Sequence, residues 1–428
     1  MDNSEKIVSS AVLEPGAGTD TAGGGAMPVF RRAGLTLYVD LALASSFFFG
    51  AFVLSWQTFS YLEPIAFKPE VWFQADIGRV ERVLTDRYSG FHERSRIHPL
   101  FSLVDTPIVY GLMRVGGLDA TTSIQLLIAL VAGLWATLFY VCCRLLLPTT
   151  WDAILLTALG AASASFLFWA TVPETFLFGS VTMLLCAMGA AIYDRRPFGS
   201  VGLGALAAIS LTMTVTNFMA GVFLLLVCRP LRTAAQIAIN AFFAIAILQI
   251  VQNLIFPEAR GMLDLRSEAR FVFDRSSGGV PDKARAVLSH SVVMPEIQTP
   301  IEFDTKNMMV SVQTSPLFSA GLWGKLGTAL WGTLLIAGVV TLASRWRQAG
   351  RAVQVCALVA VAQLALHLVY GDQTFLYSLH YMPFLLLVAG QSLYGKHATI
   401  GRVLLAALVV CCAVNNALQL IEAKTLLS

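Results

Sequence analysis

Residues 199–228 read GSVGLGALAAISLTMTVTNFMAGVFLLLVC, and this stretch sets the number of times that the chain can cross a membrane. It is too long for one upright transmembrane helix, which needs about 20 apolar residues. Three threonines and Asn217 interrupt its middle with polar side chains. We therefore expect two short spans, 199–213 and 215–228, joined by a turn at the far membrane surface.

The whole chain is strongly apolar. Of its 428 residues, 56% are hydrophobic and 13% are charged, the mean hydropathy is +0.70 and the formal net charge is +3. An average soluble domain has roughly 45–50% apolar and about 25% charged residues. The composition therefore excludes a soluble globular protein, a disordered protein and a nucleic-acid-binding protein, and it indicates a multi-spanning membrane protein.

Nine further apolar runs are long enough, or nearly so, to cross a bilayer as helices. They cover residues 34–56, 121–147, 150–170, 174–193, 231–255, 325–344, 352–370, 374–394 and 400–421. The sequence thus predicts an all-α polytopic membrane protein with about eleven transmembrane helices. The seven cysteines lie within these runs or at their ends, so we interpret them as small core residues rather than as disulfides or metal ligands.

Positive charge predicts the orientation of the spans, because cytoplasmic loops are enriched in Lys and Arg. With Arg31 and Arg32 inside, the inside connections carry many basic residues, opposed only by Asp152 and Asp194. These basic residues are Arg144, Arg195, Arg196, Arg229, Arg232, Arg345, Arg347, Arg351, Lys396 and Arg402. We expect the N-terminus inside, with residues 1–33 as a disordered cytoplasmic tail, and the C-terminus outside.

Two long outside loops interrupt the transmembrane domain, which we assign to residues 34–428. The loops comprise residues 57–119 and 257–324, and they hold about half of the charged residues. We place residues 98–119 as an interfacial helix lying on the outer surface. Because long ordered loops usually carry function, we expect the chemistry at this outer face.

Asp76 is the first candidate for a functional residue. Apolar side chains at positions 77, 80, 83 and 84 predict an amphipathic helix that begins near Asp76. The aspartate could serve as the N-cap of that helix or as a catalytic carboxylate, and the sequence leaves both interpretations open.

A basic group stands at the end of the same segment. Arg96 and His98 flank Ile97 and would share one side of an extended strand, where they could bind a phosphate. The alternative is interfacial anchoring by arginines, and Arg94 fits that alternative better.

Further candidates lie at the outer ends of later spans. Glu174 follows Pro173 at the start of a span, where the helix dipole stabilises a carboxylate, and Asn217 sits at the outer turn of the split stretch. Tyr377, His380 and Tyr381 fall at i, i+3 and i+4 and would share a helix face, either as an aromatic belt or as part of a site. Arginines of the second loop, Arg270 among them, would pair with neighbouring acids or reach a phosphate.

Four short segments spread over about residues 34–395 resemble the C-type (GT-C) superfamily of membrane glycosyltransferases, which includes the protein O-mannosyltransferases and the lipid A aminoarabinose transferases. Each matches a family motif: the acidic motif of the first outside loop, the basic-Pro-Leu segment, the second acidic position and the late aromatic-Pro segment. They are Phe73-Gln74-Ala75-Asp76, Arg96-Ile97-His98-Pro99-Leu100, Pro173-Glu174-Thr175 and Tyr377-Ser378-Leu379-His380-Tyr381-Met382-Pro383. Ala75 departs from the family, in which many members carry a second acid at this site.

The resemblance implies transfer of a sugar, with inversion, from a polyprenyl-phosphate donor to a cell-envelope glycan or lipid at the periplasmic face of a bacterial inner membrane. It implies that Asp76 is the base and that Glu174 orients the acceptor, shares the base role or helps to hold a divalent cation. Whether such a cation binds stays open, because the sequence shows no ligand set for a metal. The residues expected to bind substrate are Arg96, His98, Asn217, Arg270, Tyr377, His380 and Tyr381.

The alternative function is a transporter or flippase of lipid-linked or amphiphilic solutes. Transporters place ionisable residues and broken helices near the bilayer midplane, whereas the polar clusters of this chain fall on one side. A non-catalytic subunit of an envelope assembly is a third interpretation.

Overall fold

The computed structural model describes residues 37–66, 71–262, 266–273, 278–298 and 309–427. The chain divides into two units, residues 1–41 and 42–428, and only the start of helix α1 (Leu37–Ala66) is described in the first. The expected tail, residues 1–33, lies outside the described residues. The account below concerns the second unit.

The described residues are helical, without a β-sheet, and seven helices are long and apolar enough to cross a membrane. These are α1, α4 (Ala120–Leu146), α7 (Phe176–Arg195), α10 (Leu231–Ile255), α12 (Leu322–Ser344), α13 (Arg351–Val369) and α15 (Ala398–Leu427). Shorter helices fill the other expected spans: α5 (Thr150–Ala162), α6 (Ala164–Trp169), α8 (Ser200–Thr212), α9 (Phe218–Cys228) and α14 (Ser378–Ala389). The seven long helices indicate a multi-pass membrane protein.

The split of residues 199–228 is confirmed. Helix α8 ends at Thr212, a single 3₁₀ turn η2 (Val215–Asn217) follows, and α9 begins at Phe218. The backbone groups freed by the break bond to the segment before α3: Leu100 N–H donates to the Thr212 carbonyl (2.8 Å) and Val215 N–H to the Ile97 carbonyl (3.0 Å). The break therefore holds the first outside loop in place.

The expected span 150–170 is broken at Ser163, between α5 and α6. The Ser163 hydroxyl accepts the Phe166 N–H (3.2 Å), and the N–H groups of Ala164 and Ser165 donate to the carbonyls of Val292 and Ser291. Residues of the second outside loop thus supply backbone partners to a broken helix, which fixes that loop against the bundle.

The first outside loop folds into α2 (Ile77–Thr85), η1 (Gly90–Arg96) and α3 (Phe101–Arg114). The amphipathic helix expected after Asp76 is confirmed, since Ile77, Val80, Val83 and Leu84 are its buried residues. The expected interfacial segment 98–119 contains α3. Helix α1 continues to Ala66, so this loop starts later than residue 57.

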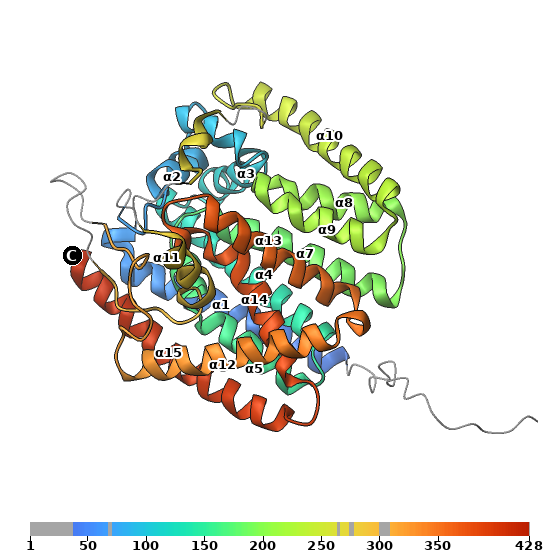
Figure 1. Cartoon of the computed structure of the whole chain (residues 1–428). Coiled ribbons are helices and arrows are strands. Elements are labelled where there is room, and N and C mark those ends of the chain that lie inside the picture. The colour runs from blue at the N-terminus through green and yellow to red at the C-terminus, as the bar shows by residue number, and fades with distance from the viewer. Residues whose placement is uncertain (1–36, 67–70, 263–265, 274–277, 299–308, 428) are drawn as a thin grey trace, which may run out of the picture. The chain divides into compact units, whose positions relative to one another are not determined.

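The second outside loop contains η3 (Arg266–Phe271), α11 (Val280–Arg285) and the π-helical turn η4 (Ala286–His290). Figure 1 shows α2, α3 and α11 toward the left, away from the connection between α9 and α10 on the right. Residues 271–273 run antiparallel to 369–371. The Phe273 N–H donates to the Val369 carbonyl (2.7 Å), and the Gly371 N–H donates to the Phe271 carbonyl (3.0 Å). This pairing joins η3 to the C-terminal end of α13.

Helices at the periphery expose large apolar side chains. Phe243 and Leu254 of α10 and Ile336 of α12 are 59%, 78% and 66% exposed, whereas α7 is almost entirely buried. Contiguous apolar exposure of this kind is costly in water and is expected of helices that face lipid.

Candidate functional site

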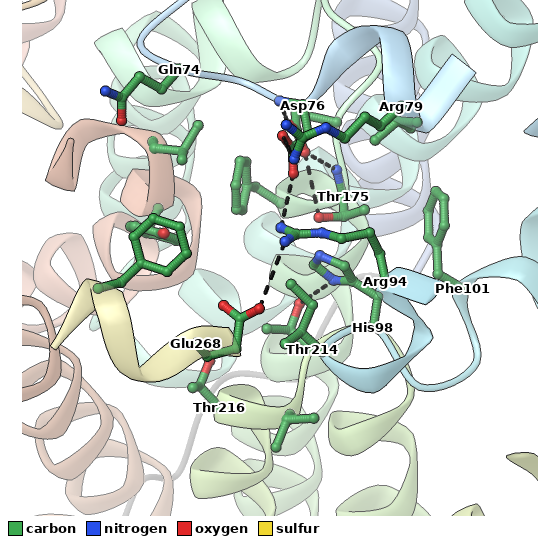
Figure 2. Close-up of a pocket in the computed structure, with 18 of the residues that line it drawn as sticks. Gln74, Asp76, Arg79, Arg94, His98, Phe101, Thr175, Thr214, Thr216 and Glu268 are labelled. Atoms are coloured by element: carbon green, nitrogen blue, oxygen red, sulfur yellow. Dashed lines mark hydrogen bonds and ion pairs between the residues drawn. The ribbon is translucent and has the colours of Figure 1, made fainter. Parts of the chain in front are cut away.

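A cavity of about 460 Å³ lies where the two outside loops meet the helix ends. Its walls come from the start of α2, η1, the loop before α7, η2, η3 and the connection between α13 and α14. We call it the site cavity. Figure 2 shows that charged side chains from several of these elements converge in it.

Asp76 stands at the N-terminus of α2, but among the described residues its side chain makes no capping hydrogen bond. Its carboxylate instead forms ion pairs with Arg79 (Nη1–Oδ1, 2.7 Å) and Arg94 (Nη2–Oδ2, 2.8 Å). Asp76 is thus the N-cap residue of α2 by position, but its side chain does not cap the helix. The carboxylate is directed toward two guanidinium groups and lines the site cavity.

Backbone strain directs this carboxylate. Phe73 and Gln74, just before it, have φ angles of 51° and 64°, which non-glycine residues rarely adopt. Phe73 is fully buried, with its ring 4.7 Å from that of Phe375 between centroids, and its N–H donates to the Val310 carbonyl (3.2 Å). Such conformations persist where the surroundings enforce them, typically at functional sites.

Glu174 is the second carboxylate of the site and is only 3% exposed. Its Oε1 accepts the backbone N–H of Asp76 (2.5 Å) and its Oε2 accepts that of Thr175 (2.8 Å). Burial raises the pKa of Glu174 to about 7, and the negative charge of Asp76 acts in the same direction. The site thus pairs two carboxyl groups in different environments, one ion-paired and half-buried, the other buried and exchanging its proton near neutral pH.

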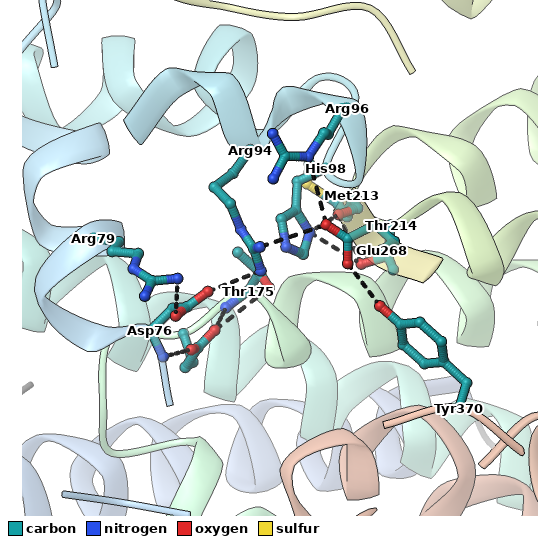
Figure 3. Close-up of polar contacts among 11 residues, drawn as sticks. Asp76, Arg79, Arg94, Arg96, His98, Thr175, Met213, Thr214, Glu268 and Tyr370 are labelled. Carbon is teal, nitrogen blue, oxygen red and sulfur yellow. Dashed lines mark hydrogen bonds and ion pairs between the residues drawn. The ribbon is translucent and has the colours of Figure 1, made fainter. Parts of the chain in front are cut away.

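Arg94 links the acids of the two loops. Figures 2 and 3 show its guanidinium between Asp76 and Glu268, with the Glu268 Oε1 atom 3.8 Å from Nη1. Arg96 reaches the same Oε1 through Nε at 3.5 Å and also contacts the exposed Glu93. The Tyr370 hydroxyl donates to the other oxygen of Glu268 (2.8 Å).

The structure places the two arginines differently from what the sequence suggested. The expectation of an extended strand at Arg96 and His98 is wrong, because residues 90–96 form the 3₁₀ helix η1. In a 3₁₀ helix successive side chains lie a third of a turn apart, so the alternation of a strand does not apply. Arg94 lines the site cavity, and Arg96 is not among the described residues that do.

His98 lines the site cavity as a neutral imidazole. Its Nδ1 donates to the Met213 carbonyl (2.8 Å) in the break between α8 and α9, which leaves Nε2 as an acceptor. Burial, reinforced by the charge of Arg94, lowers the pKa of His98 to about 3. The positive charge of the site therefore comes from its arginines and not from this histidine.

The opposite wall is formed by amide, carboxylate and aromatic groups. The Gln74 amide donates to Asp372 (3.2 Å), and Tyr377 stacks on His367 with ring centroids 4.6 Å apart. Gly371, at φ +85°, leaves room for Tyr377, since a Cβ there would lie 2.7 Å from the tyrosine ring. All these residues except Gly371 line the site cavity.

Besides Arg96, three more expected site residues are not among the described residues that line the cavity: Asn217, His380 and Tyr381. Tyr381 is buried and donates to the Thr374 carbonyl (3.0 Å). Asn217 and His380 are buried beside Gly179 of α7, where within the described residues the Asn217 amide and His380 Nε2 have no hydrogen-bond partner. Arg270 belongs to η3, but its side chain lies outside what the structure describes.

Several site residues were missed in the sequence. Arg79 follows Asp76 by three positions, a spacing that favours an ion pair on a helix and could have been recognised. Glu268 was expected to pair along a solvated helix with its own neighbours, and Tyr370 carried no signal beyond lying at the end of a span. Within the described part of the chain, no three His, Cys, Asp or Glu side chains form a group that could hold a metal ion.

Comparisons with known protein families and with curated proteins found no match to this chain.

Proposed function

We propose that the protein is a membrane glycosyltransferase that moves a sugar from a polyprenyl-phosphate donor to a hydroxyl group of a cell-envelope glycan or lipid. The observation that carries this proposal is the meeting of Asp76, Glu174 and Arg94 in one cavity at the ends of apolar helices. The resemblance of the surrounding segments to the GT-C superfamily points in the same direction.

The proposed reaction needs a group that binds a phosphate and stabilises it as it leaves. Arg94 and Arg79 supply this charge from the wall that carries Asp76. A guanidinium offers paired donors that match phosphate oxygens, and its charge counts for more in a half-buried cavity than in water. In the proposed encounter the donor phosphate binds a guanidinium that also pairs with Asp76.

The proposed reaction also needs a base for the acceptor hydroxyl. The acceptor oxygen attacks the anomeric carbon, its proton passes to the Asp76 carboxylate, and the bond between that carbon and the phosphate oxygen breaks. The electron pair leaves with the polyprenyl phosphate, and attack opposite the leaving group inverts the anomeric centre. Glu174 holds the Asp76 backbone by its N–H and thereby fixes where the base stands.

The lining of the cavity suits a lipid-linked substrate. Val80, Val83, Phe91, Ile97 and Phe101 form apolar walls next to the arginines. A polyprenyl chain could pack on such walls while its phosphate stays with the guanidinium groups.

The test is release of polyprenyl phosphate by purified protein incubated with a panel of polyprenyl-phosphate sugars and envelope acceptors. Asp76→Asn should lower the rate by about 10²–10⁴-fold, because general-base catalysis contributes that much. Asp86→Asn is the matched control, since Asp86 is an exposed aspartate at the other end of α2 and should leave the rate near that of the wild type.

Turnover at the wild-type rate in Asp76→Asn, with an unchanged melting temperature, would remove the proposed base. Movement of a lipid-linked sugar across vesicles without release of polyprenyl phosphate would favour the transporter.

A further inference from the structure

Glu268 is held as a bound anion would be. Its carboxylate contacts two guanidinium groups, Arg94 at 3.8 Å and Arg96 at 3.5 Å, and accepts a hydrogen bond from the Tyr370 hydroxyl at 2.8 Å. Burial raises the pKa of Tyr370, so this hydroxyl stays protonated and can only donate to an anion beside it. Two arginines and one hydroxyl form a donor set that also suits a phosphate group.

Glu268 also covers Arg96. The glutamate is among the residues that line the site cavity, whereas Arg96, which touches it from behind, is not. Figure 3 shows the carboxylate between Arg96 on one side and Tyr370 on the other. If this carboxylate turned aside, a second guanidinium would face the cavity.

The two acids on Arg94 differ in how they are fixed. Asp76 is the proposed base, and its backbone N–H donates to the Glu174 carboxylate. Glu268 comes from the other loop, on the short turn η3, and its contacts to the arginines are longer than those of Asp76. Glu268 is therefore the acid that can be exchanged while the base stays in place.

We propose that Glu268 is an internal anion that occupies the phosphate position in the free protein and exchanges with the phosphate of the lipid during each turnover. This inference rests on the proposed function. The leaving polyprenyl phosphate is a monoester, which carries more negative charge than the donor diester and would be held tightly by two arginines. Return of the Glu268 carboxylate to Arg94 and Arg96 offsets that attraction and favours release of the product.

The test is equilibrium binding of two probes, farnesyl phosphate and inorganic phosphate, to the full-length protein in detergent. Glu268→Gln keeps an acceptor for the Tyr370 hydroxyl but removes the competing charge, so it should bind both probes roughly tenfold more tightly. Glu93→Gln is the matched control: Glu93 also pairs with Arg96 at 3.5 Å but is exposed, and its loss should leave both affinities unchanged.

Arg94→Gln separates this inference from the proposed function, with Arg94→Lys as the substitute if the first variant has a lowered melting temperature. Weaker binding in the Arg94 variant with no gain in Glu268→Gln would overturn the internal anion alone. Unchanged binding in the Arg94 variant would overturn the phosphate site and the proposed function with it. A gain in Glu268→Gln for farnesyl phosphate but not for inorganic phosphate would also overturn the exchange, because the glutamate would then act on the lipid chain.

Discussion

Asp76 and Glu174 show how two carboxyl groups of one site acquire different properties. Asp76 is half-buried and forms ion pairs with two arginines, whereas Glu174 is buried and accepts bonds from two backbone N–H groups and from its neighbouring threonine. Different surroundings move the proton affinities of two acids apart, which is how many enzymes divide acid and base roles.

The raised pKa of Glu174 predicts a pH dependence of stability. Its carboxyl group holds a proton more tightly in the folded protein, with a pKa of about 7, than the ordinary value of 4.5 in the unfolded chain. Its contribution to stability is thus fully present below about pH 4.5 and is lost as the pH rises through 7. We expect the melting temperature of Glu174→Gln to fall less than that of the wild type between pH 5 and pH 8. Equal slopes for the two proteins would show that Glu174 keeps an ordinary proton affinity.

At the residue scale the sequence predicted the acidic residues of the site better than its arginines. Asp76 stands out because it comes just before an amphipathic helix, and Glu174 because it comes just before an apolar one. Which of Arg94 and Arg96 lines the site cavity depends on whether residues 90–96 form a strand or a 3₁₀ helix. Local sequence does not distinguish these two structures. Glu268 and Tyr370 join the site through pairing of residues 271–273 with 369–371, which is a tertiary contact.

At the scale of elements, the break between α8 and α9 is the feature that organises the site. The break offers carbonyl groups to Leu100 and His98 and lines the site cavity with Thr214, Val215 and Thr216. The apolar run and its polar interruption predicted the break, because three threonines and Asn217 place polar side chains in the middle of the run. The breaks within residues 150–170 escaped prediction, since they depend on backbone partners from the second loop.

Helix α7 packs closely on its neighbours at Gly179, and this contact predicts a stability effect. A Cβ at this position would lie 2.6 Å from both Asn217 Nδ2 and His380 Nε2, so Gly179→Ala forces two buried side chains apart. We expect a loss of about 1–3 kcal/mol, seen as a lowered melting temperature in detergent. Gly332→Ala in the middle of α12 is the control, because a Cβ there meets nothing within 4 Å and should raise stability by about 0.5–1 kcal/mol. Similar shifts for the two variants would contradict the close packing.

At the scale of the whole molecule, the arrangement predicts which ends of the helices face outward. The site cavity is built from the two loops assigned to the outside, whereas the basic connection 345–351 is assigned to the inside. The seven native cysteines are buried, so an introduced cysteine can report exposure. In right-side-out vesicles we expect an impermeant maleimide to label Tyr88→Cys, at a position that is 69% exposed. Trp346→Cys, at a position that is 40% exposed, should react only after permeabilisation, and the reverse pattern would invert the proposed orientation.

The hydrogen bond from the Phe73 N–H to the Val310 carbonyl has a consequence for biosynthesis. A ribosome makes residue 310 long after residue 73, so the carbonyl that accepts the Phe73 N–H is missing until the second loop emerges. The left-handed backbone before Asp76 then acquires this bond only after residue 310 of the 428 has been made. A nascent chain that ends before residue 310 would therefore still lack this bond, and the proposed centre would be complete only after the later loop has folded against the earlier one.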